Sequence, residues 1–221
     1  MTRKPTRTSV YLKLFAPILF FAACTAPAPS FSSASGGGSS MQTDQSRQDQ
    51  ITRGRFLVIS HACGDCHGGG SDPAAAGWLD GMRDTIVQQF RVGPFITRPK
   101  NLTPDNTTGI GRFTERQLFN SLRYGLRPEE TPDVEITSTV PGQGNFPQHP
   151  HYLAVPMPWP SWRHMPDRDL WAIATYVKSL KPVSHKVQDS DGPPDFWASE
   201  YTVAKIGPYP ARPYPTANEK R

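Results

Sequence analysis

Cys63-Gly64-Asp65-Cys66-His67 is the stretch of this sequence that decides its fold. It has the form C-x-x-C-H, the attachment signature of c-type haem. The two-residue spacer lets both thiols bond to one porphyrin edge, and the histidine that follows is placed beneath the iron as an axial ligand. The stretch therefore predicts one covalently attached haem c, held by Cys63, Cys66 and His67, in a protein that carries electrons.

Paired cysteines also occur in three other kinds of site. A plain disulfide needs no histidine beside it, and a thioredoxin-like redox pair needs a surrounding βαβ pattern. No apolar β-branched strand precedes Cys63, and both flanks have helical patterns. A zinc site needs two more ligands at matched spacing, but there is no second cysteine pair, and the other histidines are scattered: His61, His149, His151, His164 and His185. Haem attachment is therefore the favoured interpretation.

Residues 1–24 have the pattern of a bacterial export signal. A basic region precedes Leu14 to Ala23, an apolar run too short to span a bilayer comfortably. Cys24 ends the run Phe21-Ala22-Ala23-Cys24, which resembles a lipoprotein signal whose cysteine is acylated. An ordinary signal peptide cut near Ala26 and an uncleaved anchor are the alternatives. All three predict a periplasmic domain, in the compartment where bacteria attach c-type haem, and the first predicts a lipid anchor at Cys24.

The net charge of +5 does not indicate a nucleic-acid partner. Four of the 24 basic residues lie within residues 1–24, which contain no acidic residue, so the rest of the chain carries 20 basic and 19 acidic side chains. A nearly neutral domain lacks the basic excess that binds phosphate backbones.

Composition divides the remaining chain into three parts. Residues 25–47 are rich in serine and glycine and predict a flexible tether. Residues 48–185 are long enough for one domain with its own core. Residues 186–221 form a proline-rich extension. Prolines also concentrate between Pro128 and Pro160, where they indicate long loops.

Three helices are predicted, and no segment alternates with the period of a strand. The first runs from about Gln48 to Ser60 and has Gly54 inside it, which indicates close packing against another helix. The second follows Thr114, because Thr114-Glu115-Arg116-Gln117 fits a capping box, and it ends near Gly125. The third follows Pro166, with apolar residues at helical spacing up to Leu180. The fold class is therefore all-α.

An electron-transfer haem takes a second axial ligand, and methionine suits this role because its thioether favours ferrous iron. Met157 is favoured, since Pro156 and Pro158 stiffen the backbone on both sides. Met165 stands just before the third helix, and Met82 follows soon after the haem motif. His149, His151 or an open coordination site are the remaining alternatives.

Several motifs together resemble a known family. Arg53 to His67 is similar to the first helix and haem motif of class I c-type cytochromes. More specific are three further stretches, which resemble cytochrome c domains in subunits of bacterial membrane-bound alcohol, aldehyde and gluconate dehydrogenases: Asn101-Leu102-Thr103-Pro104-Asp105, Met157-Pro158-Trp159 and Tyr176 to Val183. The resemblance covers about Asp49 to Val183.

This resemblance implies the class I cytochrome c fold, with few helices and long proline-rich loops around the haem. It implies Met157 as the second iron ligand and a close crossing of the first and last helices, with Tyr176 or Val177 against Gly54. It also implies that a proline carbonyl soon after the motif, at Pro73 or Pro94, accepts a hydrogen bond from His67. The stretch between Gly125 and Met157 is longer than in the family, and such subunits typically carry three haem motifs where this chain has one.

The sequence thus predicts an electron carrier with one haem, rather than an enzyme. Its partners are expected to be redox proteins: a dehydrogenase or quinol-oxidising complex as donor, and an oxidase or another cytochrome as acceptor. Arg123, Trp159 and Trp162 are candidates for contacts with the haem propionates or for covering the haem edge; a solvated arginine and core-filling tryptophans are an equally good interpretation. The alternative functions are an open-site haem enzyme of peroxidase or reductase type, and a haem-based sensor or assembly subunit.

Overall fold

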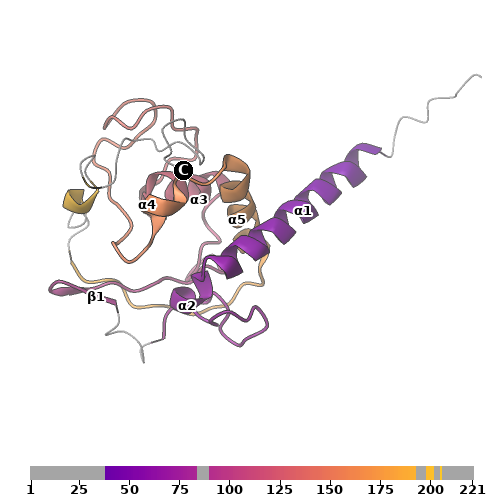
Figure 1. Cartoon of the computed structure of the whole chain (residues 1–221), viewed down its shortest axis with the longest axis horizontal. Coiled ribbons are helices and arrows are strands. Elements are labelled where there is room, and N and C mark those ends of the chain that lie inside the picture. The colour runs from indigo at the N-terminus through magenta and orange to yellow at the C-terminus, as the bar shows by residue number, and fades with distance from the viewer. Residues whose placement is uncertain (1–37, 84–89, 193–197, 202–204, 206–221) are drawn as a thin grey trace, which may run out of the picture. The chain divides into compact units, whose positions relative to one another are not determined.

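The computed structural model describes residues 38–83, 90–192, 198–201 and 205. Residues 1–37, with Cys24 and the predicted export signal, lie outside this part, as does most of the C-terminal extension. The described chain is largely helical (Figure 1). The longer helices are α1 (Gly38–Ser60), α3 (Glu115–Tyr124) and α5 (Asp167–Ser179), and the short ones are α2 (Cys63–His67) and α4 (Trp159–Trp162). Single 3-10 turns form η2 (Pro128–Glu130) and η3 (Ala198–Glu200).

Helix α1 begins at Gly38, about ten residues before the expected start at Gln48. Part of the segment predicted to be a flexible tether is therefore helical. No proline interrupts residues 38–47, so nothing in this polar stretch forces the helix to end.

Helix α3 begins and ends where local chemistry predicts. The Thr114 hydroxyl accepts a hydrogen bond from the Gln117 amide at 3.1 Å, and the Gln117 side chain accepts one from the Thr114 amide at 3.0 Å. Gly125 closes the helix with φ 68°, in the left-handed region that glycine tolerates best. The capping box and the C-terminal glycine are both confirmed.

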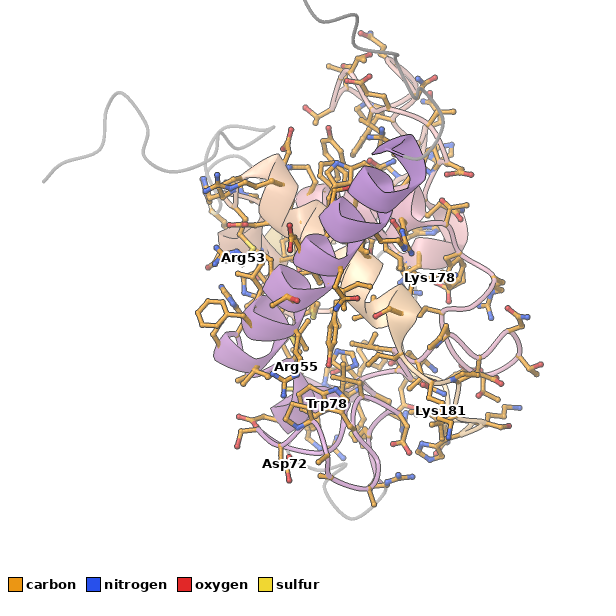
Figure 2. The ribbon with its side chains drawn as sticks, turned by 90° about the vertical axis from the view of Figure 1, so that its right-hand side faces the viewer. Arg53, Arg55, Asp72, Trp78, Lys178 and Lys181 are labelled. Carbon is orange, nitrogen blue, oxygen red and sulfur yellow. The ribbon has the colours of Figure 1, made fainter. Side chains whose placement is uncertain are left out.

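Helices α1 and α5 cross at Gly54, as the sequence indicated. A Cβ atom at Gly54 would stand 2.0 Å from the Ala172 carbonyl oxygen and 2.6 Å from Tyr176 Cβ. On the same face, the Arg53 guanidinium binds both carboxylate oxygens of Asp169 at 3.0 Å. Figure 2 shows α1 lying across the rest of the helical core, with Arg53 and Arg55 on it.

One hydrophobic cluster unites these helices with the haem motif. Its buried members from α1, α2 and α5 include Val58, Cys63 and Ile173, and Trp78 joins them from the loop after α2. The Trp78 indole donates to the Tyr176 hydroxyl at 3.1 Å, which ties that loop to α5. The short helix with the cysteines is thus built into the main core.

The long stretch after α3 has its own small core, formed by Leu126, Ile136 and Phe146. An isolated bridge pairs Leu126 with Tyr152 and brings the two ends of this stretch together. A hairpin of β1 (Arg91–Val92) and β2 (Phe95–Ile96) is a small departure from the all-α expectation. Within the described chain, no helix is long and apolar enough to cross a membrane.

Candidate functional site

All three residues of the haem signature lie on α2, within little more than one helical turn. Cys63 is buried, whereas Cys66 and His67 are partly exposed. Both thiols are free, and no disulfide joins them. A single short element therefore presents two thiols and an imidazole from adjacent positions.

Two glycines let the chain fold tightly around α2. A Cβ atom at Gly64 would stand 2.1 Å from the Gly70 carbonyl oxygen and 2.5 Å from the Trp78 ring. Gly68, just after the helix, has φ 103°, which L side chains rarely adopt. Because these glycines allow a tight turn, the chain after α2 folds back on the helix. The Gly81 amide then donates a hydrogen bond to the His67 carbonyl at 2.7 Å.

The imidazole of His67 is oriented by Lys100. Its Nδ1 atom lies 2.7 Å from the Lys100 carbonyl oxygen and donates to it, because a carbonyl can only accept. The acceptor is thus neither Pro73 nor Pro94, the two residues that the sequence suggested. Nε2 is left as the nitrogen that could bind a metal.

Partial or full removal from water favours the uncharged form of all three side chains. It raises the pKa of the Cys63 thiol to about 12, with a further contribution from the neighbouring Cys66. It also raises the pKa of Cys66, helped by the charge of Asp65. Desolvation lowers the pKa of His67, partly offset by the hydrogen bond to Lys100. This lowered pKa favours the neutral imidazole, the form that ligates metals.

These observations fit a c-type haem better than the other cysteine chemistries. Redox-active C-x-x-C pairs have lowered thiol pKa values, opposite to the direction here. Across the described ranges, no three His, Cys, Asp or Glu side chains gather as a metal site would require. Two protonated thiols beside a neutral, oriented imidazole are the donor set that covalent haem attachment and axial ligation need.

Met157 and Met165 both pack, partly buried, against the core cluster that contains Cys63. The Met157 amide donates to the Ala154 carbonyl at 2.9 Å, which folds its loop into a turn. Met165 is less free to move, since its carbonyl accepts a hydrogen bond from Arg123 at 2.8 Å. Met157 as the second axial ligand stays a prediction.

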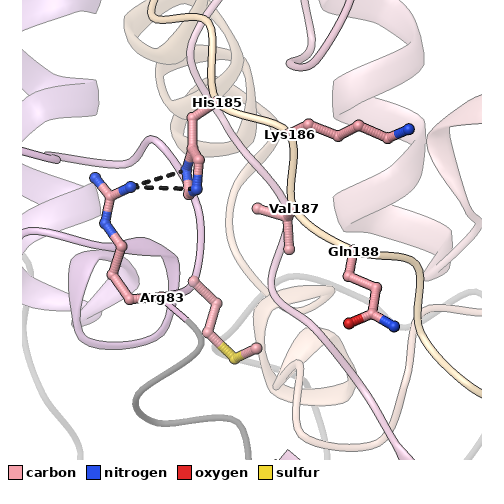
Figure 3. A pocket seen from close by; sticks show the side chains of 6 residues that line it. Arg83, His185, Lys186, Val187 and Gln188 are labelled. Carbon is pink, nitrogen blue, oxygen red and sulfur yellow. Dashed lines mark hydrogen bonds between the residues drawn. The ribbon is translucent and has the colours of Figure 1, made fainter.

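The other candidates for the second ligand lie elsewhere. Met82 is buried and, together with Arg83 and residues 185–188 of the C-terminal segment, lines a pocket of about 400 Å³ (Figure 3). In this pocket the Arg83 guanidinium lies 3.2 Å from the ring nitrogens of His185. His149 and His151 border a second pocket beside Tyr152 and Ala198, and the His151 ring pairs with Glu130.

Arg123, a candidate propionate partner, serves the protein itself. It is buried, and its guanidinium donates to the carbonyl oxygens of Arg163 and Met165 and to the carboxylate of Asp167. Trp162 meets the His61 ring edge-on at 5.9 Å, and Trp159 is fully buried. Arg123 therefore fixes the turn between α4 and α5, and the two tryptophans fill the core.

Sequence reasoning missed the segment that holds the Lys100 carbonyl. Residues 186–191, called the strap from here on, run beside residues 96–100. Lys100 donates to the Asp189 carboxylate at 2.8 Å, and Arg98 donates to the Asp191 carboxylate at 2.9 Å. The Asp191 amide donates to the Ile96 carbonyl at 2.9 Å. The available signal was that basic residues stand two positions apart in one segment, at Arg98 and Lys100, and acidic residues two positions apart in the other, at Asp189 and Asp191. Nothing local indicated that the two segments meet.

No protein-family model matches the chain. Curated relatives include the gluconate 2-dehydrogenase cytochrome c subunit of Pantoea cypripedii, 26% identical over 152 residues, or 68% of this chain and 28% of the relative. The fructose dehydrogenase cytochrome subunit of Gluconobacter japonicus is 27% identical over 141 residues, or 60% and 22%. An alcohol dehydrogenase (quinone) cytochrome c subunit of Komagataeibacter europaeus is 25% identical over 151 residues, or 68% and 26%.

The chain is thus similar to cytochrome c subunits of dehydrogenases, the resemblance that its motifs indicated. It spans about a quarter of the length of these relatives.

Proposed function

We propose that this protein is an electron carrier with one covalently attached haem c. The observation that carries the proposal is the arrangement on α2: two free thiols and a neutral imidazole, with His67 Nδ1 held by the Lys100 carbonyl at 2.7 Å. Cys63 and Cys66 attach the haem through thioether bonds, and His67 Nε2 supplies one axial bond. When bound, the haem supplies one-electron exchange.

The rest of the domain controls the haem's surroundings. Met157 is the second axial ligand in this proposal, because its loop packs against the same cluster as Cys63 and is stiffened by two prolines. A thioether ligand would raise the reduction potential of the haem iron. The crossing of α1 and α5 at Gly54 supports the class I cytochrome c fold.

The relatives suggest which proteins exchange electrons with it. They are cytochrome subunits of gluconate, fructose and alcohol dehydrogenases, so a dehydrogenase or a quinol-oxidising complex is the proposed donor. An oxidase or another cytochrome is the proposed acceptor. In this proposal the signal predicted for residues 1–24 directs the domain to the periplasm, and acylation of Cys24 would hold it at the membrane surface.

Two measurements on the protein produced with haem maturation test the proposal. Mass spectrometry should find the chain heavier by one haem, and Cys63→Ala combined with Cys66→Ala should abolish the added mass. The ferric protein should show the weak long-wavelength absorption band of methionine–iron ligation. Met157→Ala should remove this band, whereas Met165→Ala and Met82→Ala should keep it.

Opposite results would change the proposal in defined ways. A chain without the added mass is not a c-type cytochrome. Retention of the band in Met157→Ala excludes this residue as the ligand. Rapid carbon monoxide binding by the wild-type protein indicates an open coordination site, and with it a haem enzyme or sensor.

A further inference from the structure

The loop Leu153–Trp159, called the ligand loop from here on, contains the proposed ligand Met157 and has few restraints of its own. It begins after the bridge between Leu126 and Tyr152 and ends where α4 starts. Val155 and Pro156, in its middle, are exposed. Little burial therefore stabilises the middle of this loop, and its position depends on its two ends.

Both ends contact Gly125, the residue that closes α3. The Leu153 amide donates to the Gly125 carbonyl at 2.7 Å. At the other end the Trp159 ring lies so close to Gly125 that a Cβ atom there would stand 2.1 Å from the indole. Trp159 is fully buried and stacks on Tyr152, with ring centroids 5.9 Å apart and planes 3° from parallel.

One side chain from the C-terminal extension joins these two ends. Tyr201, just after η3, places its ring 4.8 Å from that of Trp159 and 5.2 Å from that of Tyr152. Its hydroxyl donates to the Leu153 carbonyl at 2.8 Å. In Figure 1 the short yellow turn η3, which precedes Tyr201, lies beside the loops that follow α3.

We propose that Tyr201 is a positioning residue that holds the ligand loop closed, and so keeps Met157 in place as the second haem ligand. The inference rests on the proposed ligation by Met157 and adds a role for the C-terminal extension. Two contacts carry it: the ring seals one side of Trp159, and the hydroxyl fixes the first residue of the loop. Each restrains one end, so their loss lets the middle move away from the core.

The hydroxyl is a dependable donor. Burial raises the pKa of Tyr201 to about 12, so the phenol remains protonated throughout the neutral range. Aromatic rings at 4.8 and 5.2 Å are within the distances at which such pairs attract each other.

Binding of added imidazole to the ferric, haem-loaded full chain tests this role, because imidazole competes with methionine for iron once the loop opens. We expect Tyr201→Ala to bind imidazole roughly tenfold faster or more than wild type, the effect of losing one hydrogen bond and its aromatic contacts. Tyr201→Phe, which keeps the ring, should give a smaller increase of about threefold. The methionine band of Tyr201→Ala should weaken as imidazole-free protein is warmed.

Tyr124→Phe is the matched control. Its hydroxyl also donates to a loop carbonyl, that of Ile136, at 2.9 Å, but it holds the small core after α3 and not the ligand loop. This variant should bind imidazole at the wild-type rate. Hydrogen exchange gives a second readout. The amides of residues 153–155 and 157 should exchange faster in Tyr201→Ala than in wild type, and they should exchange at the wild-type rate in Tyr124→Phe.

The outcomes separate this inference from the proposed ligation. If Met157→Ala loses the methionine band but Tyr201→Ala binds imidazole at the wild-type rate, the positioning role is overturned and the ligand assignment stands. If Met157→Ala keeps the band, both proposals are overturned. Should Tyr201→Ala fail to load haem, Tyr201→Phe decides: a raised rate supports the role, and a wild-type rate overturns it.

Discussion

His67 Nδ1 and the carbonyl oxygen of Lys100 are joined by a hydrogen bond of 2.7 Å that spans 33 positions of sequence. The acceptor lies in a segment that is itself held by the strap, through Lys100 with Asp189 and Arg98 with Asp191. The orientation of the imidazole therefore depends on a part of the chain more than eighty residues away. Two predictions concern this support.

Asn101→Ala should destabilise the protein by about 3 kcal/mol. The buried Asn101 amide donates to the Val183 carbonyl at 2.8 Å, and its oxygen accepts from the Thr103 amide at 2.9 Å and from the Thr103 hydroxyl at 2.8 Å. The variant removes these three hydrogen bonds and leaves the Thr103 amide, in a buried residue next to Lys100, without its side-chain acceptor. Chemical denaturation monitored by haem absorption measures the loss. Asn145→Gly, which removes one exposed hydrogen bond to the Glu135 carbonyl, is the control; an equal loss in both variants contradicts the prediction.

Asp191→Asn should make stability less sensitive to acid. The hydrogen bond from Arg98, and its positive charge, lower the pKa of Asp191 in the folded protein. A lowered carboxyl pKa stabilises the folded state at pH values above the unfolded pKa of about 4, and this stabilisation is lost as pH falls through the folded value. Melting temperatures of wild type and variant should therefore differ at neutral pH and converge in acid. Glu129→Gln, which removes a carboxylate from the exposed pair with Arg112, is the control and should melt close to the wild-type temperature at neutral pH. If the difference in melting temperature between Asp191→Asn and wild type is the same at all pH values, the ionic contact with Arg98 does not account for it.

Local signals predicted the parts of this fold that depend on neighbouring residues. The capping box of Thr114 and Gln117 and the closing Gly125 are formed within one helix, so the sequence contains all the information that they need. The close approach at Gly54 was also predictable. An interior glycine lowers helix stability, and close packing of another chain segment is a reason for it to stand there. In the structure, the α5 backbone at Ala172 is that segment.

Long-range partners could not be predicted in this way. Any backbone carbonyl could have accepted the His67 hydrogen bond, since carbonyls have no signature in a sequence, and Lys100 was therefore missed. Arg123 could pair with a propionate or with protein carbonyls, and only its surroundings decide. Tyr201 follows a proline-rich stretch without periodicity, so nothing indicated that its ring packs on Trp159. The ligand role of Met157 stays a prediction.

Gly54→Ala should destabilise the protein by about 2 kcal/mol, although alanine favours helices by about 1 kcal/mol over glycine. The added methyl would meet the Ala172 carbonyl oxygen at 2.0 Å, so α1 and α5 must move apart. Gly54→Leu should lower the yield of haem-loaded protein sharply. Arg55→Ala, at the next and exposed position of α1 (Figure 2), should change the free energy of unfolding little. Wild-type stability of Gly54→Ala would show that the crossing is looser than the structure indicates.

Lys178→Met should destabilise the protein by about 1–3 kcal/mol. The Lys178 ammonium donates to the carbonyl oxygens of Gly111 and Phe113, both at 2.7 Å, and so ties α5 to the turn that leads into α3. Methionine preserves the length and packing of the side chain but leaves both carbonyls without this donor. Burial lowers the pKa of Lys178, as expected for an ammonium that has exchanged water for these carbonyls. Lys181, three residues later, is exposed (Figure 2), so Lys181→Met removes the same charge without removing these contacts. Chemical denaturation should show a clear loss in the free energy of unfolding for Lys178→Met and almost none for Lys181→Met. Equal losses would mean that net charge, and not the two hydrogen bonds, accounts for the effect.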